Sequence, residues 1–131
     1  MAGRQGAGRH GQSTAHALAR IYGTMAAGGA WQSKPLISRR AIEEAARPRF
    51  RGMDESFGMP AAFAAGYQIE DPVYAGRASP QTFGHTGWGG SVGFADPSAA
   101  LGFGYVTNNM LGFDDIDPRR KALIDVVYDS L

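Results

Sequence analysis

Two early segments of the chain carry apolar residues at helical spacing. In the first, apolar side chains recur three or four positions apart, at Leu18, Ile21, Tyr22 and Met25. This spacing is typical of one face of an amphipathic helix. Ser13 or Thr14 can cap its start, and Gly28-Gly29 would end it.

A second, shorter helix is predicted to begin after Ser38 and to run through about Ala46. Ser38 can accept a hydrogen bond from the exposed backbone amides of the first turn, and Pro48 lies just beyond the expected end. Residues 47–60 show neither helical nor alternating spacing, so we expect irregular structure there.

The middle of the chain alternates apolar with smaller or polar residues, which is the pattern of half-buried strands. One strand is predicted at Phe63, Ala65, Tyr67 and Ile69, followed by a loop over residues 71–80. Residues 83–96 would form a strand, a Gly-rich bend and a second strand. After a turn at residues 96–98, Leu101, Phe103 and Tyr105 predict a further strand ending near residues 108–109.

A closing helix is predicted from Asp117-Pro118, a capping acid with proline at the first helical position. Its buried stripe would contain Leu123 or Ile124, then Val127, Tyr128 and Leu131. The order of elements predicts the α+β class: an antiparallel sheet of about three strands with flanking helices and a C-terminal helix. We find no internal repeat.

The composition is that of one globular domain. The chain has 131 residues, 44% of them apolar and 19% charged. A formal net charge of +1 gives no reason to expect nucleic acid or an anionic membrane as a partner. The absence of cysteine excludes disulfides and thiolate metal sites. His10 and His16 have no third candidate ligand nearby, so we expect no metal site and no cofactor.

Residues 1–12 are polar, Gly-rich and without periodicity, and we expect a flexible arm preceding the domain formed by residues 13–131. They include no apolar segment of the kind found in signal peptides. No run approaches the roughly 20 apolar residues of a membrane span. The chain as given is therefore expected to be soluble and cytoplasmic.

The stretch from residue 83 to residue 96 is the strongest candidate for a functional site. It combines five glycines with His85, Thr86, Trp88 and Ser91. Glycine allows a backbone to approach another backbone or a ligand closely, and the neighbouring side chains can form hydrogen bonds. On glycine content alone, a Gly-rich turn without chemistry explains the pattern equally well.

His85-Thr86-Gly87, followed by Gly89-Gly90, resembles the third motif of the beta-lactamase-related serine hydrolases. That family includes class C beta-lactamases, D-Ala-D-Ala carboxypeptidases and lactamase-like esterases; the lactamase motif is Lys-Thr-Gly. Further segments resemble the family in the right order: STAHALARIYGTMAAGG, PLISRRAIEEA, AAFAAGYQI, LGFGYVTNNM and the final helix. The resemblance covers about residues 12–131 and corresponds to the last third of the family's domain, the C-terminal part of the beta-lactamase/transpeptidase-like fold.

The resemblance implies roles for four positions in the third motif. His85 would offer a hydrogen bond or, when protonated, a positive charge to the substrate and to a catalytic tyrosine. Thr86 would orient a substrate carboxylate or support His85, and Gly87 would let the substrate backbone lie against the strand. The backbone amide of Trp88 would be one of two oxyanion-hole donors. Neutral imidazole in place of lysine favours an esterase or peptidase over an efficient lactamase.

The other two catalytic motifs of the family are missing from the sequence. No serine has a lysine three positions later, so the nucleophile motif Ser-x-x-Lys is absent. No tyrosine or serine forms the second motif, Tyr-x-Asn or Ser-x-Asn. The resemblance therefore implies a C-terminal fragment that has no complete catalytic set and is inactive alone.

Residues 89–93 also match G-x-S-x-G, the nucleophile elbow of α/β-hydrolases. That mechanism needs Ser91 on a turn from a strand into a helix, with an acid and then a histidine later in the chain. No histidine follows Ser91, and Val92 and Phe94 continue an alternating strand pattern. We therefore interpret Ser91 as a strand residue.

Three functional hypotheses remain open. The leading one is a fragment of a serine hydrolase that acts on a small ester, amide or lactam once the missing N-terminal part completes it. The second is a non-catalytic ligand-binding or interaction protein, and the third is one part of a split hydrolase. An exposed sheet edge is expected in each case, and self-association through it is possible.

Overall fold

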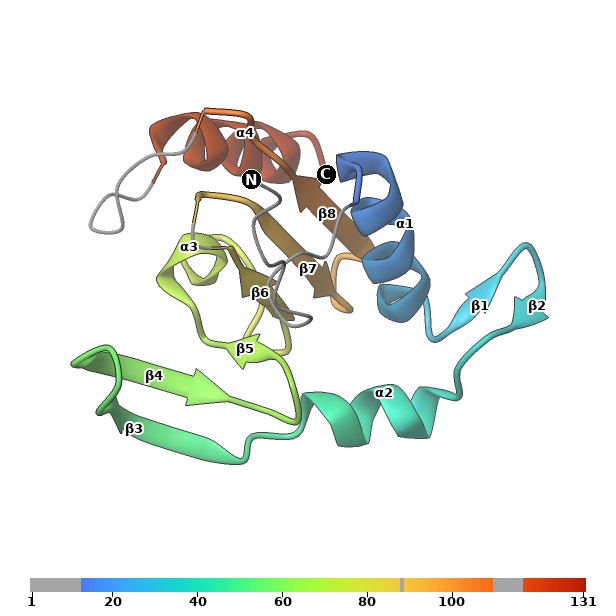
Figure 1. Ribbon diagram of the computed structural model, residues 1–131. Helices are drawn as coiled ribbons and strands as arrows, with labels where there is room; N and C mark the ends of the chain where they lie inside the picture. The colour runs from blue at the N-terminus through green and yellow to red at the C-terminus, as the bar shows by residue number, and fades with distance from the viewer. Residues whose placement is uncertain (1–12, 88, 110–116) are drawn as a thin grey trace, which may run out of the picture.

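The computed structural model describes residues 13–87, 89–109 and 117–131, and they form one antiparallel sheet with helices on both faces (Figure 1). The sheet has six strands in the order β3-β4-β5-β6-β7-β8. These strands are β3 (Phe50–Asp54), β4 (Met59–Phe63), β5 (Gln68–Ile69), β6 (Phe83–Thr86), β7 (Val92–Asp96) and β8 (Leu101–Tyr105). The α+β class is confirmed, but the prediction of about three strands was wrong.

The additional strands come mainly from residues 47–60, which were predicted to be irregular. β3 and β4 pair from Phe50 opposite Phe63 to Asp54 opposite Met59. The Asp54 carboxylate closes the connecting turn by accepting the Ser56 amide at 2.8 Å. Most side chains of β3 are exposed, so the alternation that marks a half-buried strand never arises there.

Three other local predictions need correction. The strand predicted over residues 63–69 is divided between the end of β4 and the two-residue β5. The loop predicted at 71–80 contains the short helix α3 (Pro72–Ala75), capped by Asp71. A small hairpin of β1 (Ala30–Trp31) and β2 (Lys34–Pro35) was not anticipated.

The three longer helices begin where their capping residues predicted. They are α1 (Ala15–Ala26), α2 (Arg39–Ala46) and α4 (Pro118–Asp129). Thr14 accepts the Ala17 amide at 3.1 Å and Ser38 accepts the Ala41 amide at 3.2 Å. Asp117 caps α4, and of the alternatives Leu123 and Ile124 it is Ile124 that is buried. The predicted stripes were only partly right, because Ile21 and Leu131 are exposed.

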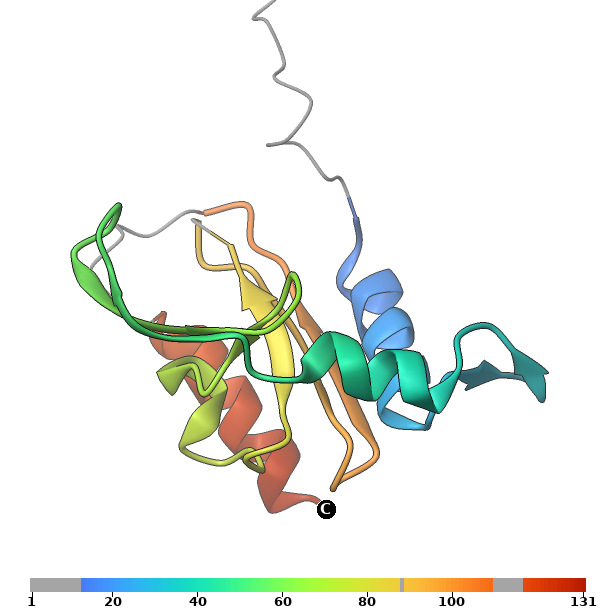
Figure 2. The same cartoon turned by 90° about the horizontal axis from the view of Figure 1, so that it is seen from below.

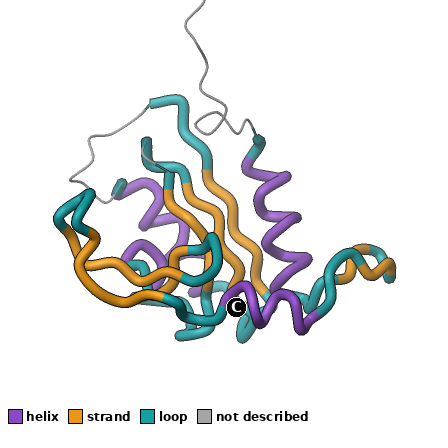
Figure 3. The backbone as a smooth tube through the Cα atoms, turned by 60° about the horizontal axis from the view of Figure 1, so that its bottom comes forward, coloured by secondary structure: helices purple, strands orange, loops and turns teal. Residues whose placement is uncertain are grey.

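The helices divide between the two faces of the sheet (Figures 2 and 3). On one face, Ala26 of α1 and Ile42 of α2 pack with Phe83 and Ala95. On the other, α3 and α4 contribute Tyr74 and Ile124, which pack with Val92 and Phe94. Consecutive β7 residues therefore enter opposite cores, and β7, in which every residue is buried, lies at the centre of the domain.

Helix α1 lies directly on β8 because two β8 residues have no side chain. A Cβ atom at Gly102 would collide with the backbone of Gly23, and one at Gly104 would collide with the Ala15 carbonyl. The contact is backbone to backbone, so neither partner can move aside by changing a rotamer.

Replacing Gly104 with alanine is expected to lower the free energy of unfolding by about 2–3 kcal/mol, since the added methyl group must displace α1 from the sheet. Urea denaturation of the variant measures this change. Gly76→Ala is the matched control, because a Cβ there meets nothing within 4 Å. Equal stability of the two variants would contradict the close packing of α1 on β8.

No helix in the part of the chain that the structure describes is long and apolar enough to cross a membrane. The same residues include no cluster of three or more His, Asp or Glu side chains that could hold a metal ion. The predicted arm over residues 1–12 lies outside the described residues.

Candidate functional site

Strand β6 presents His85 and Thr86 at an open edge. Its β7 side is paired along the whole strand, from Phe83 opposite Ala95 to Thr86 opposite Val92. On its other side, β5 pairs only with Phe83 and Gly84. The edge from His85 onward thus has no backbone partner strand among the described residues, and side chains bond to the Thr86 amide and carbonyl there instead.

Gln68 continues the hydrogen bonding of the sheet where β5 ends. Its side-chain Oε1 accepts the Thr86 amide at 2.6 Å and the Thr86 hydroxyl at 2.8 Å. The side chain of Gln68 therefore takes the place of a neighbouring strand at Thr86. Sequence reasoning missed this residue, because nothing in its local pattern indicates a partner 18 positions away.

The His85 ring is held by the carbonyl of the next residue. His85 Nδ1 lies 2.7 Å from the Thr86 carbonyl oxygen, and the ring centroid is 6.3 Å from that of Phe63. A carbonyl can only accept, so Nδ1 carries the proton. In the neutral ring Nε2 is then an acceptor, and the side chain is exposed to a ligand.

Gly87 begins a tight turn that connects β6 to β7. The Gly87 amide donates to the Ser91 carbonyl at 2.6 Å, and the Gly90 amide donates to the Gly87 carbonyl at 3.0 Å. Gly90 has φ of 105°, a conformation that favours glycine. Trp88 lies outside the described residues, so the role assigned to its amide stays a prediction.

Ser91 does not occupy a nucleophile elbow. It directly precedes β7, whereas the elbow requires a turn from a strand into a helix. Its carbonyl is engaged with Gly87. The prediction that Ser91 is itself a strand residue was wrong by one position, because β7 begins at Val92.

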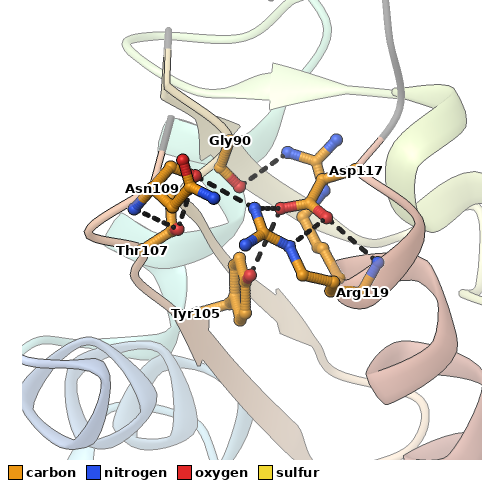
Figure 4. Close-up of polar contacts among 7 residues, drawn as sticks. Gly90, Tyr105, Thr107, Asn109, Asp117 and Arg119 are labelled. Atoms are coloured by element: carbon orange, nitrogen blue, oxygen red, sulfur yellow. Dashed lines mark hydrogen bonds and ion pairs between the residues drawn. The ribbon is translucent and has the colours of Figure 1, made fainter. Parts of the chain in front are cut away.

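A buried carboxylate lies behind the turn, at the start of α4 (Figure 4). Asp117 is 1% exposed and accepts the Tyr105 hydroxyl at 3.2 Å. The Arg119 guanidinium donates to both of its oxygens, at 2.9 and 2.8 Å, and these bonds lower the pKa of Asp117 to about 2. Sequence analysis predicted Asp117 only as a helix cap.

Arg120, the next residue along α4, lies beneath the turn. It is 4% exposed and donates from Nη1 to the Gly90 carbonyl at 2.9 Å. Its Nε has no hydrogen-bond partner, and burial lowers the pKa of the guanidinium. Burial raises the pKa of Asp71, while the Val73 amide and the charges of Arg120 and His85 oppose that rise. The charges of Arg120 and His85 thus both act on the carboxylate of Asp71.

The bonds that Arg119 and Tyr105 make to Asp117 should make the free energy of unfolding in acid depend on this one carboxylate. Its folded pKa is about 2, below the value of about 4 expected in the unfolded chain. The stabilisation is therefore complete above about pH 4 and is lost as the pH falls towards about 2. Urea denaturation across this range should show a shallower decline for Asp117→Asn than for the unmodified chain; identical slopes would contradict the arrangement.

Comparison with solved structures identifies the architectural class. The chain is similar to a penicillin-binding protein homologue from Caulobacter crescentus, with a TM-score of 0.82 and 38% identity over 91% of this chain. It is also similar to a family VIII carboxylesterase, with a TM-score of 0.80 and 38% identity over 87% of this chain. The described residues thus have the fold of one part of these penicillin-binding-protein-like structures.

The chain belongs to the beta-lactamase family, whose model matches residues 2–126. The esterase/beta-lactamase LipL of Mycobacterium tuberculosis is 36% identical over 103 residues, which are 78% of this chain. The resemblance drawn from the sequence is therefore confirmed. The chain spans only 23% of LipL, 32% of the Caulobacter homologue and 31% of the carboxylesterase.

Proposed function

We propose that residues 85–87 form the substrate-facing strand of a serine hydrolase site that acts on an ester, amide or lactam carbonyl. The exposed His85 side chain, on the part of β6 that β5 does not cover, carries this proposal, because a substrate can lie beside it. The reaction would be acyl transfer to serine, followed by hydrolysis. The sequence contains no Ser-x-x-Lys motif, so the nucleophile comes from a segment outside it.

His85 would act in this site through Nε2. Nδ1–H is engaged with the Thr86 carbonyl. In the neutral ring Nε2 can therefore only accept a hydrogen bond, for example from a hydroxyl, and it becomes a donor when the ring is protonated. Lysine at the same position would be a donor at every working pH. This difference favours ester or peptide substrates, whose hydrolysis does not depend on a fixed cation at this point.

Thr86 would support the strand rather than bind substrate. Its hydroxyl has a single proton, and that proton is donated to Gln68. Of the two roles that the family resemblance implies for Thr86, support of His85 fits this bonding better than orientation of a carboxylate. Gly87 leaves the edge free of a side chain where the substrate backbone would pass.

The proposal predicts that the chain alone is catalytically inert. A p-nitrophenyl ester and a chromogenic lactam should show no turnover above the buffer rate, and a fluorophosphonate probe should not label the protein. Ser91 precedes a strand and not a helix, and among the described residues no histidine, lysine or carboxylate is hydrogen-bonded to its hydroxyl. Turnover or labelling that disappears in Ser91→Ala would overturn the proposal.

A second candidate function is ligand binding without catalysis, which the same exposed part of β6 favours. Saturable binding of an acyl ester or a peptidoglycan peptide by the chain alone, lost in Gly87→Val, would support it. A well-folded sample that binds neither compound would exclude it.

A further inference from the structure

The turn that follows the substrate-facing strand β6 is held in place by residues at the start of α4. Gly90, at its end, gives its carbonyl oxygen to Nη1 of Arg120 at 2.9 Å. A Cβ at Gly90 would lie 3.4 Å from Oδ2 of Asp117, so the turn packs directly on that carboxylate. Both contacts come from the start of α4, 27 or more positions away in the sequence.

Ion pairing does not explain why the Arg120 side chain is buried. The carboxylate nearest in the chain, Asp117, already receives Arg119 and Tyr105, and no ion pair to Arg120 is formed among the described residues. Arg120 is 4% exposed, and among the described residues its Nε has no partner. Burying a guanidinium in this way is costly, and the one hydrogen bond that it forms with this part of the chain is to the carbonyl of Gly90.

Two further hydrogen bonds connect Gly87 to Gly90 and to Ser91. The Gly90 amide donates to the Gly87 carbonyl, and the Gly87 amide donates to the Ser91 carbonyl. Fixing the Gly90 carbonyl therefore fixes the plane of the turn and, with it, the backbone directly after Thr86. Gly90 can adopt its φ of 105° without a steric cost from Cβ.

We propose that Arg120 is a positioning residue: from the first turn of α4 it holds the Gly87–Gly90 turn in the orientation that the substrate-facing strand requires. Its effect on catalysis rests on the proposed function, whereas the anchoring itself does not. Arg120 contacts no reacting group, so it acts only through the backbone of the turn.

Amide hydrogen exchange in the full chain, measured residue by residue by NMR, tests the anchor. Arg120→Met keeps most of the side-chain volume but removes every donor, and Arg120→Lys retains one charged donor. Lys121→Met is the matched control, because Lys121 also lies near the start of α4 but its side chain pairs with Asp125 and not with Gly90 or Asp117.

Loss of a charge-assisted hydrogen bond should raise exchange at Gly87 and Gly90 by about tenfold to a hundredfold in Arg120→Met. Exchange at Phe94 and Ile124 in the two cores should stay unchanged. Arg120→Lys should recover part of the protection, and Lys121→Met should leave both glycines as they are. Unchanged glycine exchange would overturn the proposal, and so would an equal rise at every core amide, since Arg120 would then only stabilise the fold.

The catalytic consequence is measured in a hybrid enzyme, in which this chain replaces the matching segment of LipL. Arg120→Met should lower kcat about tenfold to a hundredfold with little change in KM, and Arg120→Lys should restore part of the rate. An unaltered kcat would overturn the catalytic part of the proposal. A folded hybrid that is inactive before any substitution would refute the proposed function, and the exchange result would then decide the anchor.

Discussion

Replacing Gly87 with valine is expected to lower ester hydrolysis by the LipL hybrid at least about a hundredfold. A Cβ at Gly87 would lie 3.3 Å from the Ser91 Cβ, and the two branches of valine need still more room. The turn must therefore shift, and the backbone directly after His85 and Thr86 shifts with it.

Steady-state kinetics with a p-nitrophenyl ester measures this effect. Gly76→Val is the control, because a Cβ at that glycine meets nothing within 4 Å. Circular dichroism should show that both variants retain the fold. Activity of Gly87→Val within a factor of about two of the unmodified hybrid would contradict the placement of the substrate beside Gly87.

Replacing His85 with alanine is expected to lower kcat/KM of the hybrid by about 10²–10³, the effect of losing a positioned hydrogen-bonding or proton-transfer group. His85→Phe should behave similarly, because it retains the ring but no Nε2. His16→Ala serves as the control, since His16 lies on α1 and outside β6. Because His85 is exposed, the substitution should leave the free energy of unfolding nearly unchanged.

If the His85 variants keep full activity, groups other than His85 carry out the chemistry of this site. A rate that falls together with the free energy of unfolding would instead indicate a structural role. The two outcomes are separated by measuring urea denaturation and kinetics on the same samples.

Local signals in the sequence predicted the ends of the long helices. Thr14, Ser38 and Asp117 each accept a hydrogen bond from an amide two or three residues later, so their effect is contained in a short window. Strand β8 was predicted for a similar reason, since its apolar residues alternate with glycine between two turns. Its end was placed too late, because the strand stops at Tyr105.

The β3–β4 hairpin could not be predicted from its local pattern. Its residues are largely exposed, and its pairing depends on Phe50 meeting Phe63, 13 positions away. The residues of the candidate site likewise include some that the local sequence predicts and some that it does not. His85, Thr86 and Gly87 form one contiguous motif, whereas Gln68 and Arg120 reach the site only through the topology of the sheet.

The central claim is that this chain supplies the substrate-facing strand of a serine hydrolase and no nucleophile. The most direct test compares hydrolysis of one p-nitrophenyl ester by the chain alone, by the LipL hybrid and by the hybrid carrying His85→Ala. We predict no turnover by the chain, turnover by the hybrid, and a loss of about 10²–10³ in kcat/KM on removal of His85. Turnover by the chain alone, or a folded hybrid without activity, would contradict the claim.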